Sequence, residues 1–136
     1  MMEHSKLIPV PTIETKPYWD ACQQKKLSVQ KCEACGHIQF YPRIMCTECS
    51  SRNVSWTEVS GEAKVITYTI VHRPILDAYK EEAPYILSIL KLNEGPTMMT
   101  NIINCPLNEV HCGMKVEVTF KNWGEDFLVP VFEPRD

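Results

Sequence analysis

The residues of this chain with the clearest chemistry are four cysteines arranged as two C-x-x-C pairs. The pairs are Cys32–Cys35 and Cys46–Cys49, and ten residues separate them. A C-x-x-C turn directs two thiolates at one ion, and Zn²⁺ accepts four such ligands in a tetrahedron. The pattern predicts a zinc site with all four cysteines as ligands. Four protein ligands close the coordination sphere, so this zinc would be structural and would leave no position for a substrate.

The segment around the cysteines must fold for these sulfurs to meet. Gly36–Arg43, between the pairs, is long enough for a short strand and a turn. Gly36 suits the left-handed turn that follows the first pair, and Ser50 holds the matching position after the second. The unit of about 35 residues around the cysteines would bury too little apolar surface to fold alone, so a bound metal would supply the missing stability. A redox dithiol is the alternative, but that chemistry needs one pair beside a βαβ pattern.

A helix and a strand are expected before the first pair. Pro17–Lys26 is predicted to form the helix, with Pro17 in its first turn and Lys25 and Lys26 at its end, where cations complement the helix dipole. Tyr18, Trp19 and Cys22 share one side at helical spacing. Leu27–Lys31 alternates as a strand. The proline-containing residues 1–16 are expected to form an irregular arm.

After the second pair the sequence becomes β-rich. Five strands are expected, with Gly61 as a turn or bulge before the first and the longer segment Cys105–Gly113 between the third and fourth. This is the strand number of an OB-fold barrel, whereas an immunoglobulin-like sandwich needs about seven strands. The expected strands are Ala63–His72, Tyr85–Leu92, Thr97–Asn104, Met114–Phe120 and Phe127–Phe132. Loops are expected at Arg73–Ala83 and Lys121–Asp126.

The formal charge of -3 is distributed unevenly. Residues 16–52 carry six basic and three acidic side chains, whereas residues 53–136 carry seven and twelve. A nucleic-acid module usually has a basic excess over the whole domain, which this chain lacks. The chain shows no signal peptide or membrane-spanning stretch, and paired cysteines fit a reducing compartment, so we expect a cytoplasmic location and no membrane partner.

Several other side chains could either contact a ligand or serve the fold. His72 and Arg73 end the longest strand, as a solvated strand end or as an anion contact. Lys31 and Arg43 belong to a basic group that is either a solvated face or an anion-attracting patch. Trp19 either packs the helix or stacks on a ligand. Paired carboxylates, a phosphate loop and a Ser/His/Asp arrangement do not stand out in the sequence.

Taken together, these segments resemble a known family, the zinc-ribbon and OB-fold acyl-CoA-associated proteins, long known as a domain of unknown function. The resemblance covers nearly the whole chain from about residue 14. One departure is Ala63, where the family often has a second glycine after Gly61. The matching segments are Tyr18-Trp19, Lys31–Gly36, Phe40, Pro42-Arg43, Cys46–Cys49, Val59–Val65, Tyr68–Pro74, Ala83–Tyr85, Leu92–Pro96 and Gly113–Phe120.

The resemblance implies a mainly β protein with three parts: an N-terminal arm and helix (1–26), a rubredoxin-like zinc ribbon (27–54) and a five-stranded OB-fold barrel (55–136). It implies a non-catalytic accessory subunit that binds acyl-CoA and serves as a scaffold in lipid metabolism. The implied partner is a thiolase-like or hydroxymethylglutaryl-CoA-synthase-like enzyme. His72 and Arg73 are the first ligand-binding candidates to test, followed by Lys31, Arg43 and Trp19.

Two other classes of function remain as alternatives. OB-folds often bind single-stranded nucleic acid by stacking in basic grooves, so a nucleic-acid-binding zinc-ribbon and OB-fold protein is the first alternative. The acidic balance of the OB-fold part argues against it. The second is a stand-alone hydrolase or redox enzyme, whose turnover would depend on Cys112 or His72.

Overall fold

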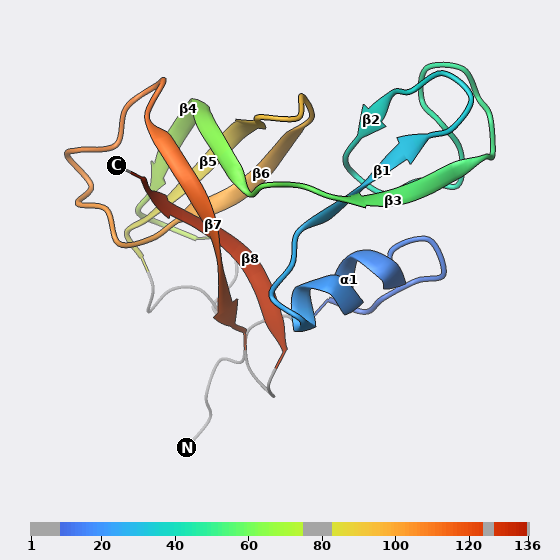
Figure 1. Ribbon diagram of the computed structural model, residues 1–136. Coiled ribbons are helices and arrows are strands. Elements are labelled where there is room, and N and C mark those ends of the chain that lie inside the picture. Colours follow the sequence, from blue (N-terminus) through green and yellow to red (C-terminus); the bar gives the residue numbers. More distant parts are fainter. Residues whose placement is uncertain (1–8, 75–82, 124–126, 136) are drawn as a thin grey trace.

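The computed structural model describes residues 9–74, 83–123 and 127–135. Over these residues the chain forms one helix, α1 (Lys16–Gln23), and eight strands arranged as a small sheet and a barrel (Figure 1). The helix and the small sheet lie together beside the barrel. This confirms the expected class, a mainly β fold with a short N-terminal helix, a zinc-ribbon region and a closed five-stranded OB-fold barrel.

The small sheet carries the first cysteine pair. It consists of β1 (Ser28–Cys32), β2 (Ile38–Gln39) and β3 (Val54–Glu58), all antiparallel and in the order β2-β1-β3. The short strand expected between the cysteine pairs is β2. β3 was not predicted, because its side chains are mostly half-buried and so lack a clear inside-outside alternation.

The barrel has the strand order β4-β5-β6-β8-β7. Its antiparallel pairs are completed by one parallel pair, in which Ile102 of β6 lies opposite Phe132 of β8. The strands are β4 (Glu62–Val71), β5 (Tyr85–Leu92), β6 (Thr97–Ile102), β7 (Lys115–Asn122) and β8 (Leu128–Pro134).

β5 has the predicted bounds, and the ends of the other barrel strands differ from the expected ones by at most two residues. β6 ends at Ile102 rather than Asn104, because Asn104 adopts a left-handed conformation with φ 56°. β7 continues to Asn122, which places Lys121 and Asn122 in a strand instead of the expected turn. Three expected segments lie mostly or partly outside the described residues. They are the rest of the turn at Lys121–Asp126, the loop at Arg73–Ala83, and the arm, of which residues 1–8 are not described.

The helix is shorter than predicted. It ends at Gln23, and Lys25 adopts a left-handed conformation with φ 60°. The amides of Lys25 and Lys26 donate to the carbonyls of Cys22 and Ala21, the paired bonds of a Schellman motif. Lys25 and Lys26 therefore lie beyond the helix, and the expectation that they occupy its last turn was wrong.

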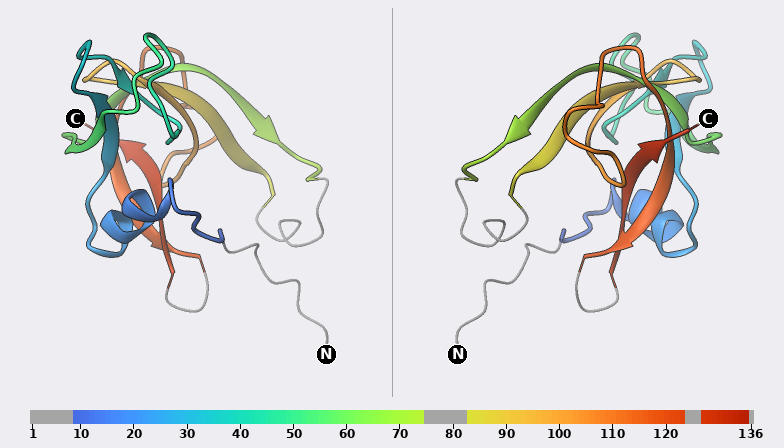
Figure 2. Two further views of the ribbon diagram at one scale, coloured as in Figure 1. Left: turned by 90° about the vertical axis from the view of Figure 1, so that its right-hand side faces the viewer. Right: turned by 90° about the vertical axis from the view of Figure 1, so that its left-hand side faces the viewer.

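One hydrophobic core joins the helix, the ribbon and the barrel. It contains Tyr18 and Cys22 of α1 and Val29 of β1 together with barrel residues such as Phe132. Gln23 adds two hydrogen bonds across the same boundary, donating to the Leu128 carbonyl at 3.0 Å and accepting from its amide at 2.9 Å. The side views in Figure 2 show the helix lying along the outer side of the barrel. This shared core fixes the ribbon against the barrel.

The connection between ribbon and barrel turns at Gly61, as the sequence predicted. Gly61 has φ 83° and its carbonyl accepts a hydrogen bond from the Val118 amide at 2.8 Å. A Cβ atom at this position would overlap the Val118 side chain. Only glycine therefore fits the turn. In the part of the chain that the structure describes, no helix is long and apolar enough to span a membrane.

Candidate metal centre and binding groove

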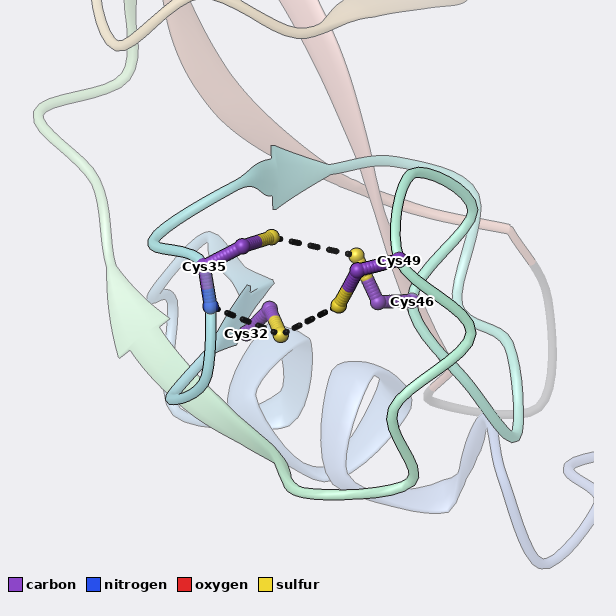
Figure 3. A group of neighbouring side chains, drawn as sticks. All are labelled: Cys32, Cys35, Cys46 and Cys49. Atoms are coloured by element: carbon purple, nitrogen blue, oxygen red, sulfur yellow. Dashed lines mark hydrogen bonds between the residues drawn. The ribbon is translucent and has the colours of Figure 1, made fainter.

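The four cysteine sulfurs converge on one point. All four lie within 4.8 Å of one another, and Figure 3 shows their side chains directed inward from two loops. The Sγ atoms of Cys32 and Cys49 are 3.6 Å apart, and those of Cys35 and Cys46 are 3.7 Å apart. Four sulfurs at the usual Zn–S bond length in a tetrahedron are separated by about 3.8 Å. The spacing thus fits a tetrahedral zinc ion.

The two cysteine loops have the same backbone structure. The first is closed by hydrogen bonds from the Gly36 amide to the Cys32 carbonyl and from the Cys32 amide to the His37 carbonyl. The second repeats both bonds fourteen residues later along the chain, from Ser50 to Cys46 and from Cys46 to Ser51. Gly36 and Ser50 have φ values of 81° and 64°. The predicted left-handed turn is therefore present in both loops.

Backbone amides donate hydrogen bonds to two of the four sulfurs. The Cys35 amide donates to the Cys32 sulfur at 3.4 Å, and the Glu48 amide donates to the Cys46 sulfur at 3.3 Å. The Cys35 amide is the largest of several hydrogen bonds that lower the pKa of the Cys32 thiol to about 6. Desolvation and the neighbouring cysteine sulfurs raise the pKa of the Cys35 thiol to about 12. Of this pair Cys32 therefore loses its proton more readily to give the thiolate, the form that binds metal.

Two buried glutamines hold the second cysteine loop in place. Gln30 of β1 and Gln39 of β2 lie opposite each other, and Gln39 donates to the Gln30 side chain at 2.8 Å. The Gln30 side chain accepts from the Arg43 amide and donates to the Arg43 carbonyl, at 2.7 and 2.8 Å. The Gln39 side chain accepts from the Thr47 amide at 3.0 Å and donates to the Met45 carbonyl at 3.2 Å.

These bonds fix residues 43–47, the segment that leads into the second cysteine pair. Neither glutamine was predicted as a site residue, although Gln30 stands out as a polar residue beside the buried Val29 in a short strand. The donor set, the sulfur spacing and the supported loops fit a structural Zn²⁺, which Cys32, Cys35, Cys46 and Cys49 would hold.

A second feature is a groove where the helix, the ribbon and the barrel meet. Its volume is about 560 Å³, and none of the described residues that line it is charged. Aromatic, methionine and proline side chains predominate. The lining residues are Pro9, Tyr18, Trp19, Phe40, Tyr41, Met98, Met99, Thr100, Asn101, Trp123, Val129, Pro130 and Val131.

The aromatic side chains of the groove contact one another and the neighbouring Phe127. The ring of Tyr18 lies 4.8 Å from that of Trp19 and 5.4 Å from that of Phe40, while the Trp19 ring lies 5.5 Å from that of Phe127. Burial raises the pKa of the Tyr18 hydroxyl well above its ordinary value. Helix, ribbon and barrel therefore build one continuous apolar wall.

A smaller hollow of about 240 Å³ adjoins the groove and shares Asn101, Trp123 and Val131 with it. Lys121 lines this hollow, and its ammonium lies 6.0 Å from the centre of the Trp123 ring. The groove is therefore uncharged over its length and has a cation beside one end.

The structure does not gather the predicted ligand-binding residues into one site. Trp19 is the one of the five that lines the groove. His72 and Arg73 are exposed at the end of β4, Lys31 is exposed on β1, and Arg43 is exposed on the ribbon loop. The groove residues Tyr41, Met99 and Trp123 were missed, because neither strand alternation nor spacing relates them in sequence.

A four-cysteine ribbon packed on a five-stranded barrel of this topology defines a zinc-ribbon and OB-fold protein. Comparison with known families agrees over both parts. A family model described as the rubredoxin-like zinc ribbon domain of ChsH2 matches residues 19–55, and one described as the C-terminal OB-fold domain of ChsH2 matches residues 56–121.

Individual proteins also match this chain over most of its length. A DUF35 domain-containing scaffold protein of Methanocaldococcus jannaschii is 36% identical over 98 residues, which cover 71% of this chain and 68% of that protein. A probable enoyl-CoA hydratase alpha subunit of Thermomonospora curvata is 29% identical over 130 residues, which cover 94% of this chain. The match spans only 40% of that longer protein.

A solved structure described as the Ltp2-ChsH2(DUF35) aldolase superposes with a TM-score of 0.84 at 27% identity, covering 93% of this chain and 98% of that one. The chain belongs to the DUF35 family of ChsH2-type zinc-ribbon and OB-fold proteins. This confirms the resemblance noted from the sequence and the assignment of zinc as a structural cofactor.

Proposed function

We propose that this chain is a non-catalytic accessory subunit that binds acyl-CoA and docks as a scaffold on a thiolase-fold or related acyl-CoA enzyme. The observation that carries the proposal is the uncharged aromatic groove shared by helix, ribbon and barrel. The names of related chains support an accessory role. They are a scaffold protein, a probable hydratase alpha subunit and a chain of an aldolase.

The composition of the groove suits binding better than acid–base chemistry. General acids and bases are usually His, Asp, Glu, Lys, Tyr or Cys side chains with a proton partner in reach. The described residues that line the groove include no carboxylate, histidine, lysine or cysteine. Of the two tyrosines that line it, Tyr18 is buried and its pKa is raised, and Tyr41 has no carboxylate or histidine beside it among these lining residues. Tryptophan, tyrosine, phenylalanine and methionine are instead enriched in the cores of protein interfaces, where charged side chains are depleted.

The groove and its neighbouring hollow also match the two halves of an acyl-CoA molecule. An acyl chain is apolar and the pantetheine arm carries no charge, and a groove lined by Trp19, Tyr41 and Met99 would hold them. The phosphates of CoA need cations, and Lys121 lies at the adjoining hollow. His72, Arg73, Lys31 and Arg43 are exposed and remain further candidates for phosphate contact or for contact with the partner.

The proposal is tested by reversing the polarity of the groove. Met99 is 63% exposed within it, and Ile13 is 93% exposed outside it. Met99→Glu places a charge in the docking surface, whereas Ile13→Glu is the matched control. We expect the unmodified chain and Ile13→Glu to co-purify with an acyl-CoA enzyme from the native host and to bind acyl-CoA in calorimetry, and Met99→Glu to lose at least one of these.

A chain that purifies alone and gives no heat with CoA or acyl-CoA would refute the proposal. Equal binding by Met99→Glu and Ile13→Glu would place the interaction elsewhere on the molecule. A titration with single-stranded nucleic acid at low salt separates the alternative class, because phosphate contacts make such binding strong and steeply salt-dependent.

A further inference from the structure

One edge of the long strand β4 is open. β4 pairs with β5 along nearly its whole length, from Ala63 to Val71. On its other side β7 pairs only with Glu62–Lys64, and two further bonds join Val65 to Met114 and Gly113. Beyond Val65, no other strand of residues 9–74, 83–123 and 127–135 pairs with that edge. Figure 2 shows this half of β4 arching on the outer side of β5.

Two residues of this edge direct their backbone groups outward. The Ile86 carbonyl faces β6, where the Asn101 side chain donates to it at 3.0 Å. Ile70 of β4 lies opposite Ile86. Because the Ile86 backbone groups point toward β6, the two residues form a non-hydrogen-bonded pair between β4 and β5. The Thr67 carbonyl faces β5, where the Ser88 hydroxyl donates to it at 2.9 Å. By the two-residue alternation of antiparallel strands, the N–H and C=O groups of Tyr68 and Ile70 point away from β5.

The side chains of the edge are also suited to pairing. Residues 66–71 are Ile-Thr-Tyr-Thr-Ile-Val, all with high β-propensity and without charge or proline. Ile66 and Tyr68 are 46% and 36% exposed. Edge strands that must stay free of partners usually carry charges, prolines or bulges. The bulge in β4 lies between Val65 and Thr67, before the residues Tyr68 and Ile70, so it does not interrupt their part of the edge.

The charged side chains at the two ends of the stretch are both basic. Lys64 precedes it, Arg73 follows it, and residues 63–73 include no acidic side chain. An antiparallel pairing of two copies about Tyr68 would bring Lys64 of one copy close to Arg73 of the other. Like charges opposite each other destabilise a strand pair, so this edge does not suit a second copy of the chain.

We propose that the β4 edge at Tyr68 and Ile70 receives an extended segment of the partner enzyme as an added strand. This rests on the proposed function, because the partner is the enzyme that the scaffold serves. Main-chain hydrogen bonds give such added strands their affinity, and alternate side chains give specificity. The segment has apolar and β-branched side chains at alternating positions, with carboxylates at its ends that face Lys64 and Arg73.

Residue-resolved amide exchange tests this inference. The acyl-CoA enzyme that co-purifies is identified by mass spectrometry, produced pure and added to the ¹⁵N-labelled full chain. In the free chain we expect the amides of Tyr68 and Ile70 to exchange rapidly and those of Thr67 and Thr69 to be protected by β5. In the complex all four are protected. Only a strand added to this edge changes alternate residues in this way.

Two substitutions at one position provide the affinity test. Tyr68→Pro removes the outward N–H without removing a bond to β5, while Tyr68→Ala removes the side chain and keeps the N–H. We expect Tyr68→Pro to bind the enzyme about tenfold more weakly than Tyr68→Ala, which corresponds to one lost hydrogen bond. Thermal unfolding of both variants checks that they remain folded. If one of them does not fold, the amide-exchange experiment still tests the inference, because it uses the unmodified chain.

The possible results separate this inference from the proposed function. If the enzyme binds but the Tyr68 and Ile70 amides stay unprotected, the strand-addition inference is wrong and the scaffold function stands. If these amides are already protected in a dimer of the free chain seen by sedimentation, the occupant is a second copy and the inference is wrong. If no acyl-CoA enzyme binds, both fail.

Discussion

Replacing Gln39 with leucine should weaken zinc binding without touching a cysteine. Leucine has about the volume of glutamine but offers no hydrogen bond. The substitution leaves the Thr47 amide, the Met45 carbonyl and the Gln30 side-chain oxygen each short of one partner. All three belong to the network that fixes the segment leading into Cys46 and Cys49.

The size of the effect follows from how buried these groups are. An unpaired buried donor or acceptor costs about 1–3 kcal/mol. Gln30 and Gln39 are only 3% and 5% exposed, whereas Thr47 and Met45 are exposed enough for water to replace part of their lost bonds. A net cost of about 2 kcal/mol in the metal-bound ribbon corresponds to roughly 30-fold weaker zinc binding.

The assay is competition for zinc against a chelator of known affinity. Co²⁺ substitution provides a second readout, because the absorption of tetrahedral cobalt reports the geometry of the four sulfurs directly. Gln24→Leu is the matched control, since Gln24 is exposed just after the helix. Zinc affinity and a cobalt spectrum equal to those of Gln24→Leu would show that the glutamine network does not position the second cysteine loop.

Three further predictions follow from single features of the structure. Cys32→Ser should lower the zinc content from about one ion per chain to near zero in elemental analysis and destabilise the ribbon, whereas Cys112→Ser, an exposed position away from the cluster, should keep the metal. Gly61→Ala should lower Tm by at least about 10 °C, because a Cβ atom would overlap the Val118 side chain. Gly113 has a similar positive φ but open space around it, so Gly113→Ala should lower Tm clearly less. Equal losses in the two variants would contradict the steric argument. Burial raises the pKa of the Cys22 thiol from 9.0 to about 12, so the unfolded chain releases a proton at a lower pH than the folded one does. The free energy of unfolding should therefore fall by up to about 1.4 kcal/mol per pH unit between pH 9 and 12 on account of Cys22. Denaturant titrations of Cys22→Ala should show a smaller loss over this range, the part that the buried Tyr18 hydroxyl contributes above its ordinary pKa.

The parts of the fold that were predictable are those with a strong local pattern. Cysteine spacing predicted the ribbon and its metal, and strand alternation predicted the five barrel strands. The end of the helix was mispredicted because Lys25 adopts a left-handed conformation, which sequence patterns rarely indicate for lysine. β3 was missed because both of its faces are partly covered, which removes the alternation that identifies a half-buried strand.

The candidate sites divide in the same way. The metal centre is local in sequence, since all four cysteines fall between residues 32 and 49. The groove draws on residues as far apart as Trp19, Tyr41, Met99 and Trp123, and only the packing of three elements brings them together. No spacing rule relates such residues. Of the ligand-binding candidates chosen from sequence, Trp19 lines the groove because it follows Tyr18, which anchors the helix in the core.

The metal centre and the groove are connected through the ribbon itself. Phe40 lines the groove and contacts Tyr18, and it is the residue directly after Gln39, whose side chain holds the segment that leads into the second cysteine pair. Tyr41 follows on the exposed side of the same loop. A ribbon without metal would leave residues 40–47 supported mainly by the two glutamines, and the wall formed by Phe40 and Tyr41 would lose its fixed position against Trp19 and Met99. A structural zinc outside the groove can thereby determine whether the groove keeps its shape.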